Sequence, residues 1–174
     1  TINRDIATLR NMLNKAVEWG YLADNPLRGI KTFKEDNERI WSLSAAEEGA
    51  LFKALGGIEE KEPYLVDLVR FALNSGMRLQ EILGLKKSDI NQELRFVLVT
   101  DTKNGESRKV PINDTLLDII KRRSKIDSEH LFSAGGQRLN NLNTSFWRAV
   151  ATAKLSKIEE GKAIRFRFHD LRHT

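Results

Sequence analysis

The sequence predicts an α+β protein that is mainly α-helical and has one small antiparallel β-sheet. Most segments place apolar residues at the spacing of an α-helix. Residues 94–112 differ, because two β-rich runs flank Asn104-Gly105, a dipeptide typical of tight hairpin turns. Residues 130–133 are a candidate for a third strand.

The N-terminal segment predicts one helix followed by a linker. Ile2, Ile6, Leu9 and Leu13 share a helical face, and Gly20 ends the periodicity. Residues 27–39 are polar and show no periodicity. We therefore expect a domain boundary in this region, with residues 1–34 belonging to one domain and residues 35–174 to a second.

The second domain should contain several short helices around the hairpin. Ser44 and Glu47 have the spacing of a capping box at a helix start. Glycines close the first two helical patterns. The expected helices cover residues 42–55, 62–76, 77–85, 113–125 and 140–158, and a last one begins at residue 167.

Composition limits the classes of function. No apolar run approaches the roughly 20 residues that cross a bilayer, so we expect no membrane association. Cysteine is absent, which excludes disulfides, thiol catalysis and thiolate metal sites and fits a cytoplasmic location. The net charge is +5, yet residues 35–62 hold eight acidic and three basic residues, so the remainder has a net charge of +10. This separation favours a polyanionic partner, DNA first, although a well-solvated surface explains it equally.

Arg78 and Lys103 are candidates for binding a phosphate. Arg78 follows a glycine break at a helix start, where its guanidinium adds to free backbone N–H groups, and Glu81 shares its helix face. Lys103 adjoins the hairpin turn and could reach a bound ligand, or could simply be a solvated turn residue. Arg108 and Lys109 on the returning strand could contact a nucleic-acid backbone.

The closing stretch "FHDLRHT" allows two interpretations. His169 and His173 are four residues apart, which on an α-helix suits zinc and would give a zinc-dependent hydrolase. Against zinc, Arg172 would place a positive charge beside the metal, and the other histidine, His130, is distant in sequence. His169 and Arg172 are three residues apart and could both donate to one phosphate.

Together these motifs resemble the tyrosine recombinases, the family of phage integrases and site-specific recombinases. "SGMRLQEILGLKKSDI", "TKNGESRKVPI" and "FHDLRHT" occur in family order. The resemblance implies catalytic roles for Arg78, Lys103, His169 and Arg172, with Glu81 and His173 in support. It also implies a recombinase catalytic core in residues 35–174, preceded by the last helix of a core-binding domain.

The same resemblance implies an activity and a departure from it. Family members cleave double-stranded DNA through a 3′-phosphotyrosyl link, need neither metal nor other cofactor, and assemble as tetramers on DNA. The two tyrosines, Tyr21 and Tyr64, both precede Arg78, whereas the family nucleophile follows the His-x-x-Arg motif. We therefore expect a piece of an enzyme that cannot cleave DNA by itself. The alternative is a recombinase relative that binds DNA without catalysis.

Overall fold

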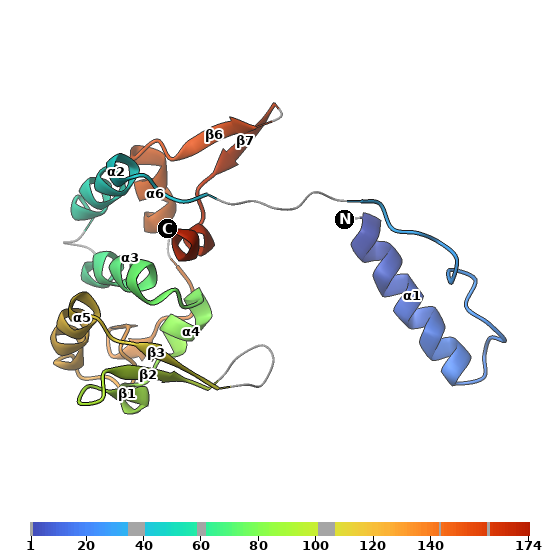
Figure 1. Ribbon diagram of the computed structural model, residues 1–174, viewed down its shortest axis with the longest axis horizontal. Helices are drawn as coiled ribbons and strands as arrows, with labels where there is room; N and C mark the ends of the chain where they lie inside the picture. The colour runs from blue at the N-terminus through green and yellow to red at the C-terminus, as the bar shows by residue number, and fades with distance from the viewer. Residues whose placement is uncertain (1, 35–40, 59–61, 101–106, 143, 160) are drawn as a thin grey trace. The chain divides into compact units, whose positions relative to one another are not determined.

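The computed structural model describes residues 2–34, 41–58, 62–100, 107–142, 144–159 and 161–174 (Figure 1). The chain divides into two compact units, Thr1–Arg39 and Ile40–Thr174. None of the helices in the described ranges is long and apolar enough to cross a membrane.

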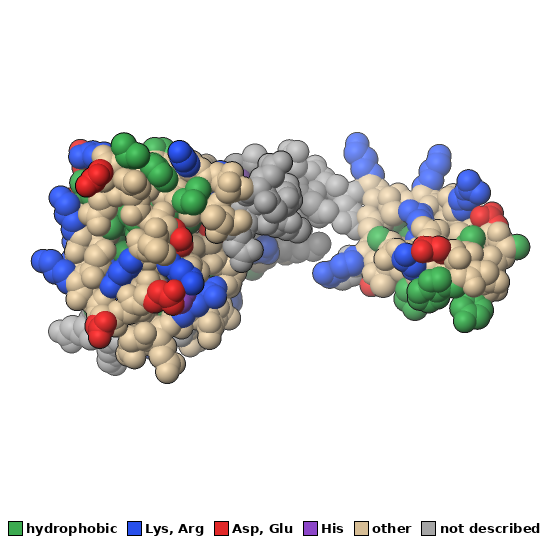
Figure 2. All heavy atoms as spheres, turned by 90° about the horizontal axis from the view of Figure 1, so that it is seen from below, with side chains coloured by type: hydrophobic (Ala, Val, Ile, Leu, Met, Phe, Trp, Pro, Cys, Tyr) green, Lys and Arg blue, Asp and Glu red, His purple; other side chains and the backbone are tan. Residues whose placement is uncertain are grey.

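The first unit is one helix with an extended segment along it. Helix α1 (Ile2–Glu18) forms as the periodicity predicts and ends before Gly20, whose φ is +79°. The amide of Asn25 donates to the carbonyl of Arg10 at 3.0 Å, and the Asn3 side chain makes two hydrogen bonds with the backbone of Phe33, each 2.8 Å long. On this unit, hydrophobic side chains gather on one side and most Lys and Arg side chains on the other (Figure 2).

The second unit contains the remaining elements. In chain order they are α2 (Ala45–Gly56), α3 (Pro63–Ser75), α4 (Leu79–Gly84), the 3₁₀ helix η1 (Lys87–Asp89), β1 (Ile90–Asn91), β2 (Phe96–Val99), β3 (Arg108–Pro111), α5 (Asp114–Ser124), β4 (Ser133–Ala134), β5 (Gln137–Arg138), α6 (Thr144–Thr152), β6 (Ser156–Glu159), β7 (Lys162–Arg165) and the 3₁₀ helix η2 (Phe168–His173). The capping box is confirmed: Ser44 Oγ accepts the Glu47 N–H at 3.3 Å, and Glu47 Oε2 accepts the Ser44 N–H at 2.8 Å.

The two strands of the predicted hairpin are confirmed as an antiparallel pair, and the Asn104-Gly105 turn lies outside the described residues. Strand β2 pairs with β3, and Val99 lies opposite Arg108. The third strand of this sheet is β1, so the prediction that residues 130–133 join it was wrong. That segment instead divides. His130 forms an isolated antiparallel bridge with Lys86, and Ser133 pairs with Arg138 across a tight turn in which Gly135 and Gly136 adopt positive φ values.

Two further predictions needed correction. The helix expected over residues 140–158 ends at Thr152, because Lys154 takes a left-handed conformation (φ +56°) and the Leu155 N–H turns back to the Val150 carbonyl. Strands β6 (Ser156–Glu159) and β7 (Lys162–Arg165) then follow and pair antiparallel. The last element, η2, is a 3₁₀ helix rather than the α-helix that the closing motif suggested.

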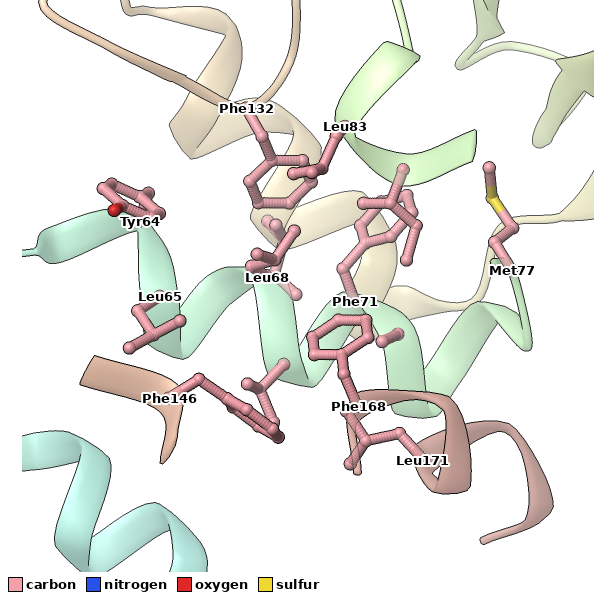
Figure 3. Packing of buried hydrophobic residues seen from close by; sticks show 14 of the residues in the cluster. Tyr64, Leu65, Leu68, Phe71, Met77, Leu83, Phe132, Phe146, Phe168 and Leu171 are labelled. Carbon is pink, nitrogen blue, oxygen red and sulfur yellow. The ribbon is translucent and has the colours of Figure 1, made fainter. Parts of the chain in front are cut away.

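Helix α3 lies at the centre of the core. Its Phe71 ring meets Phe132 edge to face, with ring centroids 5.5 Å apart. Phe168 of η2 meets Phe146 of α6 in the same way at 5.4 Å. In Figure 3, Phe168 and Leu171 of η2 lie beside the C-terminal half of α3. Because these apolar side chains are buried, η2 is fixed against α3 despite its short length.

Candidate functional site

Glu81 is the centre of a charged cluster that joins α4 to β3. Its side chain is only 5% exposed. Oxygen Oε1 accepts from Arg78 Nη1 at 2.9 Å and Arg108 Nη1 at 3.0 Å. Oxygen Oε2 accepts from the Arg78 backbone N–H at 2.8 Å and Arg108 Nη2 at 2.6 Å. Two donors therefore satisfy each carboxylate oxygen.

This environment keeps Glu81 ionised. Burial alone raises a carboxyl pKa, but the hydrogen bonds and charges of Arg108 and Arg78 outweigh burial and lower the pKa of Glu81 to about 2. The Glu81 carboxylate in turn raises the pKa of Arg108. One negative and two positive charges leave the cluster with a single excess positive charge.

Arg78 is positioned by the break between α3 and α4. Gly76 ends α3 with φ +60°, and Arg78 is the N-cap residue of α4. We had expected free backbone N–H groups at this helix start to bind a phosphate together with the Arg78 guanidinium. This is corrected in part, because the Arg78 N–H donates to Glu81 instead. The guanidinium remains available, since its side chain is 47% exposed.

A cavity of about 630 Å³ adjoins this cluster. Its charged and polar lining includes Arg78, Glu81, Lys86, His130 and Arg138, and Leu98 and Val99 of β2 supply apolar lining. Lys86 forms an exposed ion pair with Glu129, Nζ to Oε1 at 2.9 Å. His169 and Arg172 do not line this cavity.

The His-x-x-Arg residues lie on η2. Residues three apart share a face of a 3₁₀ helix, so His169 and Arg172 project to the same side, His169 exposed and Arg172 half-buried. Asp170 is buried, and its carboxylate accepts the Arg167 N–H at 2.7 Å, which caps the helix. The Ser42 hydroxyl donates to the carbonyl of His173 and holds the other end.

The structure therefore assembles one part of the predicted site directly. Arg78, Glu81 and Arg108 are in contact, and η2 lies beside the end of α3 that leads into Arg78 (Figures 1 and 3). Lys103 lies outside the described residues. Lys109 is exposed, and its Nζ lies 4.6 Å from the centre of the Phe96 ring.

A zinc site gains no support from the arrangement of side chains. The rings of His169 and His173 are 5.8 Å apart between centroids. Within the described ranges, no group of three His, Asp or Glu side chains is placed to hold a metal ion. Asp170, which lies between the two histidines in the sequence, is buried and accepts the Arg167 N–H at the start of η2.

The pairing of Arg108 with Glu81 was missed by the sequence analysis. We had expected Arg108 to contact a nucleic-acid backbone, whereas both of its terminal nitrogens donate to Glu81. The two residues are 27 positions apart, and only the pairing of β3 with β2 brings them together. Alternation along β3 was the available signal, because Arg108 shares a strand face with buried Val110.

Comparison with known proteins agrees with this architecture. The sequence profile of the Phage integrase family matches residues 42–174. The chain is 27% identical to a putative integrase/recombinase of Haemophilus influenzae over 99% of its own length and 47% of that protein. It is 30% identical to the shufflon-specific DNA recombinase of Escherichia coli over 99% of its length and 42% of that protein. The chain thus spans about half the length of the curated relatives it matches.

Solved structures show the same fold at lower identity. A lambda integrase dimer bound to a COC′ core site superposes with a TM-score of 0.74 at 21% identity, covering 96% of this chain and 62% of that one. The Tn1549 transposon integrase in complex with a circular intermediate DNA gives 0.73 at 19% identity, covering 99% and 64%. The fold of the present chain is therefore that of a tyrosine recombinase catalytic domain. The chain belongs to the phage integrase family of tyrosine recombinases.

Proposed function

We propose that this chain is the phosphate-activating part of a site-specific recombinase that cleaves and rejoins double-stranded DNA without a metal or nucleotide cofactor. The observation that supports this most is the Arg78 guanidinium, half exposed and held by a buried carboxylate whose oxygens are fully hydrogen-bonded. A cation fixed before the substrate arrives needs little reorganisation when charge develops on a phosphate. Family membership supplies the reaction class.

In the proposed reaction, a tyrosine hydroxyl gives its proton to water and attacks the phosphorus of a phosphodiester, and the bond to the 5′-oxygen breaks. A 3′-phosphotyrosyl link forms, and the departing 5′-oxygen takes a proton from Lys103. Arg78, His169 and Arg172 donate hydrogen bonds to the nonbridging oxygens, where negative charge grows. A 5′-hydroxyl of a partner strand then reverses the step, so the energy of the phosphodiester is conserved.

We propose that the nucleophile is supplied from outside these 174 residues. Tyr64 is 6% exposed in the core, its hydroxyl donates to Glu62 at 3.0 Å, and its pKa is raised to about 12, chiefly by burial. Such a phenol neither reaches DNA nor ionises easily. Residues 1–174 alone should then bind DNA without cleaving it.

Two further features of the proposal concern assembly. Residues 1–34 are the last helix of a core-binding domain with its linker, and residues 35–174 are the catalytic core. The full protein acts as a tetramer on paired DNA sites. A solved lambda integrase with this fold is a tetramer bound to a Holliday junction, which supports that assembly.

Covalent capture tests the proposed function. The full protein is incubated with nicked fragments of the DNA that flanks its gene, and protein-bound DNA is isolated under denaturing conditions. We expect a phosphotyrosyl adduct that forms in the presence of EDTA. The rate of its formation should fall by about 10²–10³-fold in Arg78→Ala and in Arg172→Ala. Salt-sensitive DNA binding without any adduct would contradict the proposed enzyme and indicate a recombinase relative that binds DNA without catalysis. Adduct formation that required added zinc would contradict the metal-free mechanism.

A further inference from the structure

We propose that Arg108 is a positioning residue for Arg78, acting through Glu81, and that it ties strand β3 to helix α4. This inference rests on the proposed function, because it concerns how the residues that act on the phosphate are held. Arg108 donates to both oxygens of Glu81, at 3.0 and 2.6 Å, in the forked geometry that arginine forms with carboxylates. Arg78 binds the same carboxylate from α4.

Arg108 does more than add a hydrogen bond to Glu81. It provides two of the four donors to a carboxylate that is only 5% exposed, so water cannot readily replace it. Without Arg108, the Glu81 charge would be balanced by Arg78 alone. With two of its four donors gone, Glu81 would no longer be held in one position, and the Arg78 guanidinium that it binds would lose its fixed orientation toward a phosphate.

Because Arg108 lies in the sheet, its ion pair with Glu81 has a second effect. Arg108 is the first residue of β3 and pairs with Val99, the last residue of β2. These two residues form the last described pair of the two strands. The ion pair from Arg108 to Glu81 therefore fixes this end of the sheet relative to α4 and Arg78.

Cleavage kinetics of the full protein test the proposal, with the DNA recovered by covalent capture as substrate. Arg108→Ala should lower the cleavage rate at saturating DNA by about 10–100-fold, as expected for misplaced reacting groups, while the affinity for DNA changes by no more than about threefold. Arg108→Lys should fall between wild type and Arg108→Ala, because lysine keeps the charge but not the fork. Arg95→Ala is the matched control, since it removes an exposed Arg–Asp pair, 2.8 Å long, that joins the residue before β2 to the start of α5.

A double variant separates positioning from direct contact with DNA. If Arg108 acts through Glu81, then Glu81→Ala/Arg108→Ala should be no slower than the slower single variant. If Arg108 instead touches the DNA, the two losses should multiply. Multiplying losses, or an Arg108→Ala rate within twofold of wild type, would overturn the proposal.

The pH profile gives a readout that a merely structural role would not change. Arg78 and Arg108 face the Glu81 carboxylate, and Lys86, Asp89, His130 and Arg138 line the adjoining cavity. Burial raises the pKa of Glu81 and Arg108 lowers it, so the Glu81 pKa should rise when Arg108 is lost. The Arg108→Ala rate should then fall between pH 7 and pH 5 more steeply than the wild-type rate. Glu81→Gln/Arg108→Ala, which has no carboxylate to protonate, should lose this extra dependence, and an unchanged dependence would contradict the proposal.

A measurement without cleavage keeps the proposal testable by itself. In the 174-residue chain, the Arg78 Nε–Hε signal in NMR should become mobile in Arg108→Ala and stay ordered in Arg95→Ala. An ordered Arg78 in Arg108→Ala would refute the positioning role. If the wild-type protein formed no adduct, the proposed function would be wrong. If the wild-type protein and Arg108→Ala were equally active, only the role of Arg108 would be contradicted.

Discussion

Arg122 of α5 and Asp67 of α3 form an ion pair at the edge of the core, with Nη2 and Oδ1 2.6 Å apart. The Asp67 side chain is only 10% exposed. Its neighbour Arg123 is buried, which lowers the pKa of Arg123, and the negative charge of Asp67 partly offsets that effect. Asp67 thus joins two helices and compensates a buried cation.

Replacing Asp67 by alanine should destabilise the second unit. The change removes a charge-assisted hydrogen bond and leaves Arg123 without its compensating charge, so we expect a loss of about 1–3 kcal/mol in the free energy of unfolding. Urea denaturation of the 174-residue chain measures it. Asp118→Ala, an exposed acid on α5, should change stability by less than about 0.5 kcal/mol. Equal stability of the two variants would show that the pair contributes nothing.

Glu81 should make stability depend on acid. Its pKa of about 2 lies below the ordinary value, so the folded state binds this proton less readily than the unfolded state. The resulting stabilisation, roughly 3 kcal/mol at neutral pH, is complete above the unfolded pKa near 4.5 and disappears as the pH falls toward 2. The difference in stability between wild type and Glu81→Gln should therefore shrink between pH 5 and pH 2. A constant difference across that range would be inconsistent with the lowered pKa.

Gly76 offers a test of the break before Arg78. A Cβ at this position would meet open space, yet the φ of +60° is unfavourable for any other residue. Gly76→Ala should cost about 1–2 kcal/mol in thermal or urea unfolding. Gly49→Ala should do the opposite and stabilise by about 0.5–1 kcal/mol, because Gly49 lies in the exposed middle of α2 with no atom near its Cβ position. A loss from both variants would argue against the backbone explanation.

Salt should weaken DNA binding by the 174-residue chain. Fluorescence anisotropy with a labelled 30-base-pair duplex of mixed sequence would give the slope of log affinity against log salt concentration. Arg78→Ala and Arg172→Ala should each reduce the magnitude of this slope by about 1 if each contacts one phosphate. Arg95→Ala, whose guanidinium pairs with Asp114, should leave the slope unchanged. No change of slope in either test variant would count against phosphate contacts at these residues.

Local signals in the sequence predicted most of the second unit. The capping box at Ser44, the break at Gly76 and the pairing of β2 with β3 all depend on residues near one another in the chain. The hydrogen bonds or dihedral angles that these signals predict are nearly independent of the rest of the fold. The structure confirms all three predictions for that reason.

The errors arose where neighbours in space decide the conformation. The end of α6 depends on a left-handed Lys154, a conformation for which lysine gives no sequence signal. The third strand came from Ile90–Asn91 rather than from residues 130–133, because His130 bridges Lys86 and Ser133 pairs with Arg138 across a glycine turn. The pairing of Arg108 with Glu81 depends on sheet register and α4 together, which no short motif encodes.

The hydrogen bond from Ser42 to His173 joins residues 131 positions apart. Closing a chain segment of that length has an entropic cost of about 4 kcal/mol, and contacts already formed between the two ends reduce it. We therefore expect η2 to attach late in folding, after α3 and α6 have formed the apolar surface that receives Phe168 and Leu171. A newly synthesised chain would then place His169 and Arg172, which lie on η2, only once the rest of the unit has folded.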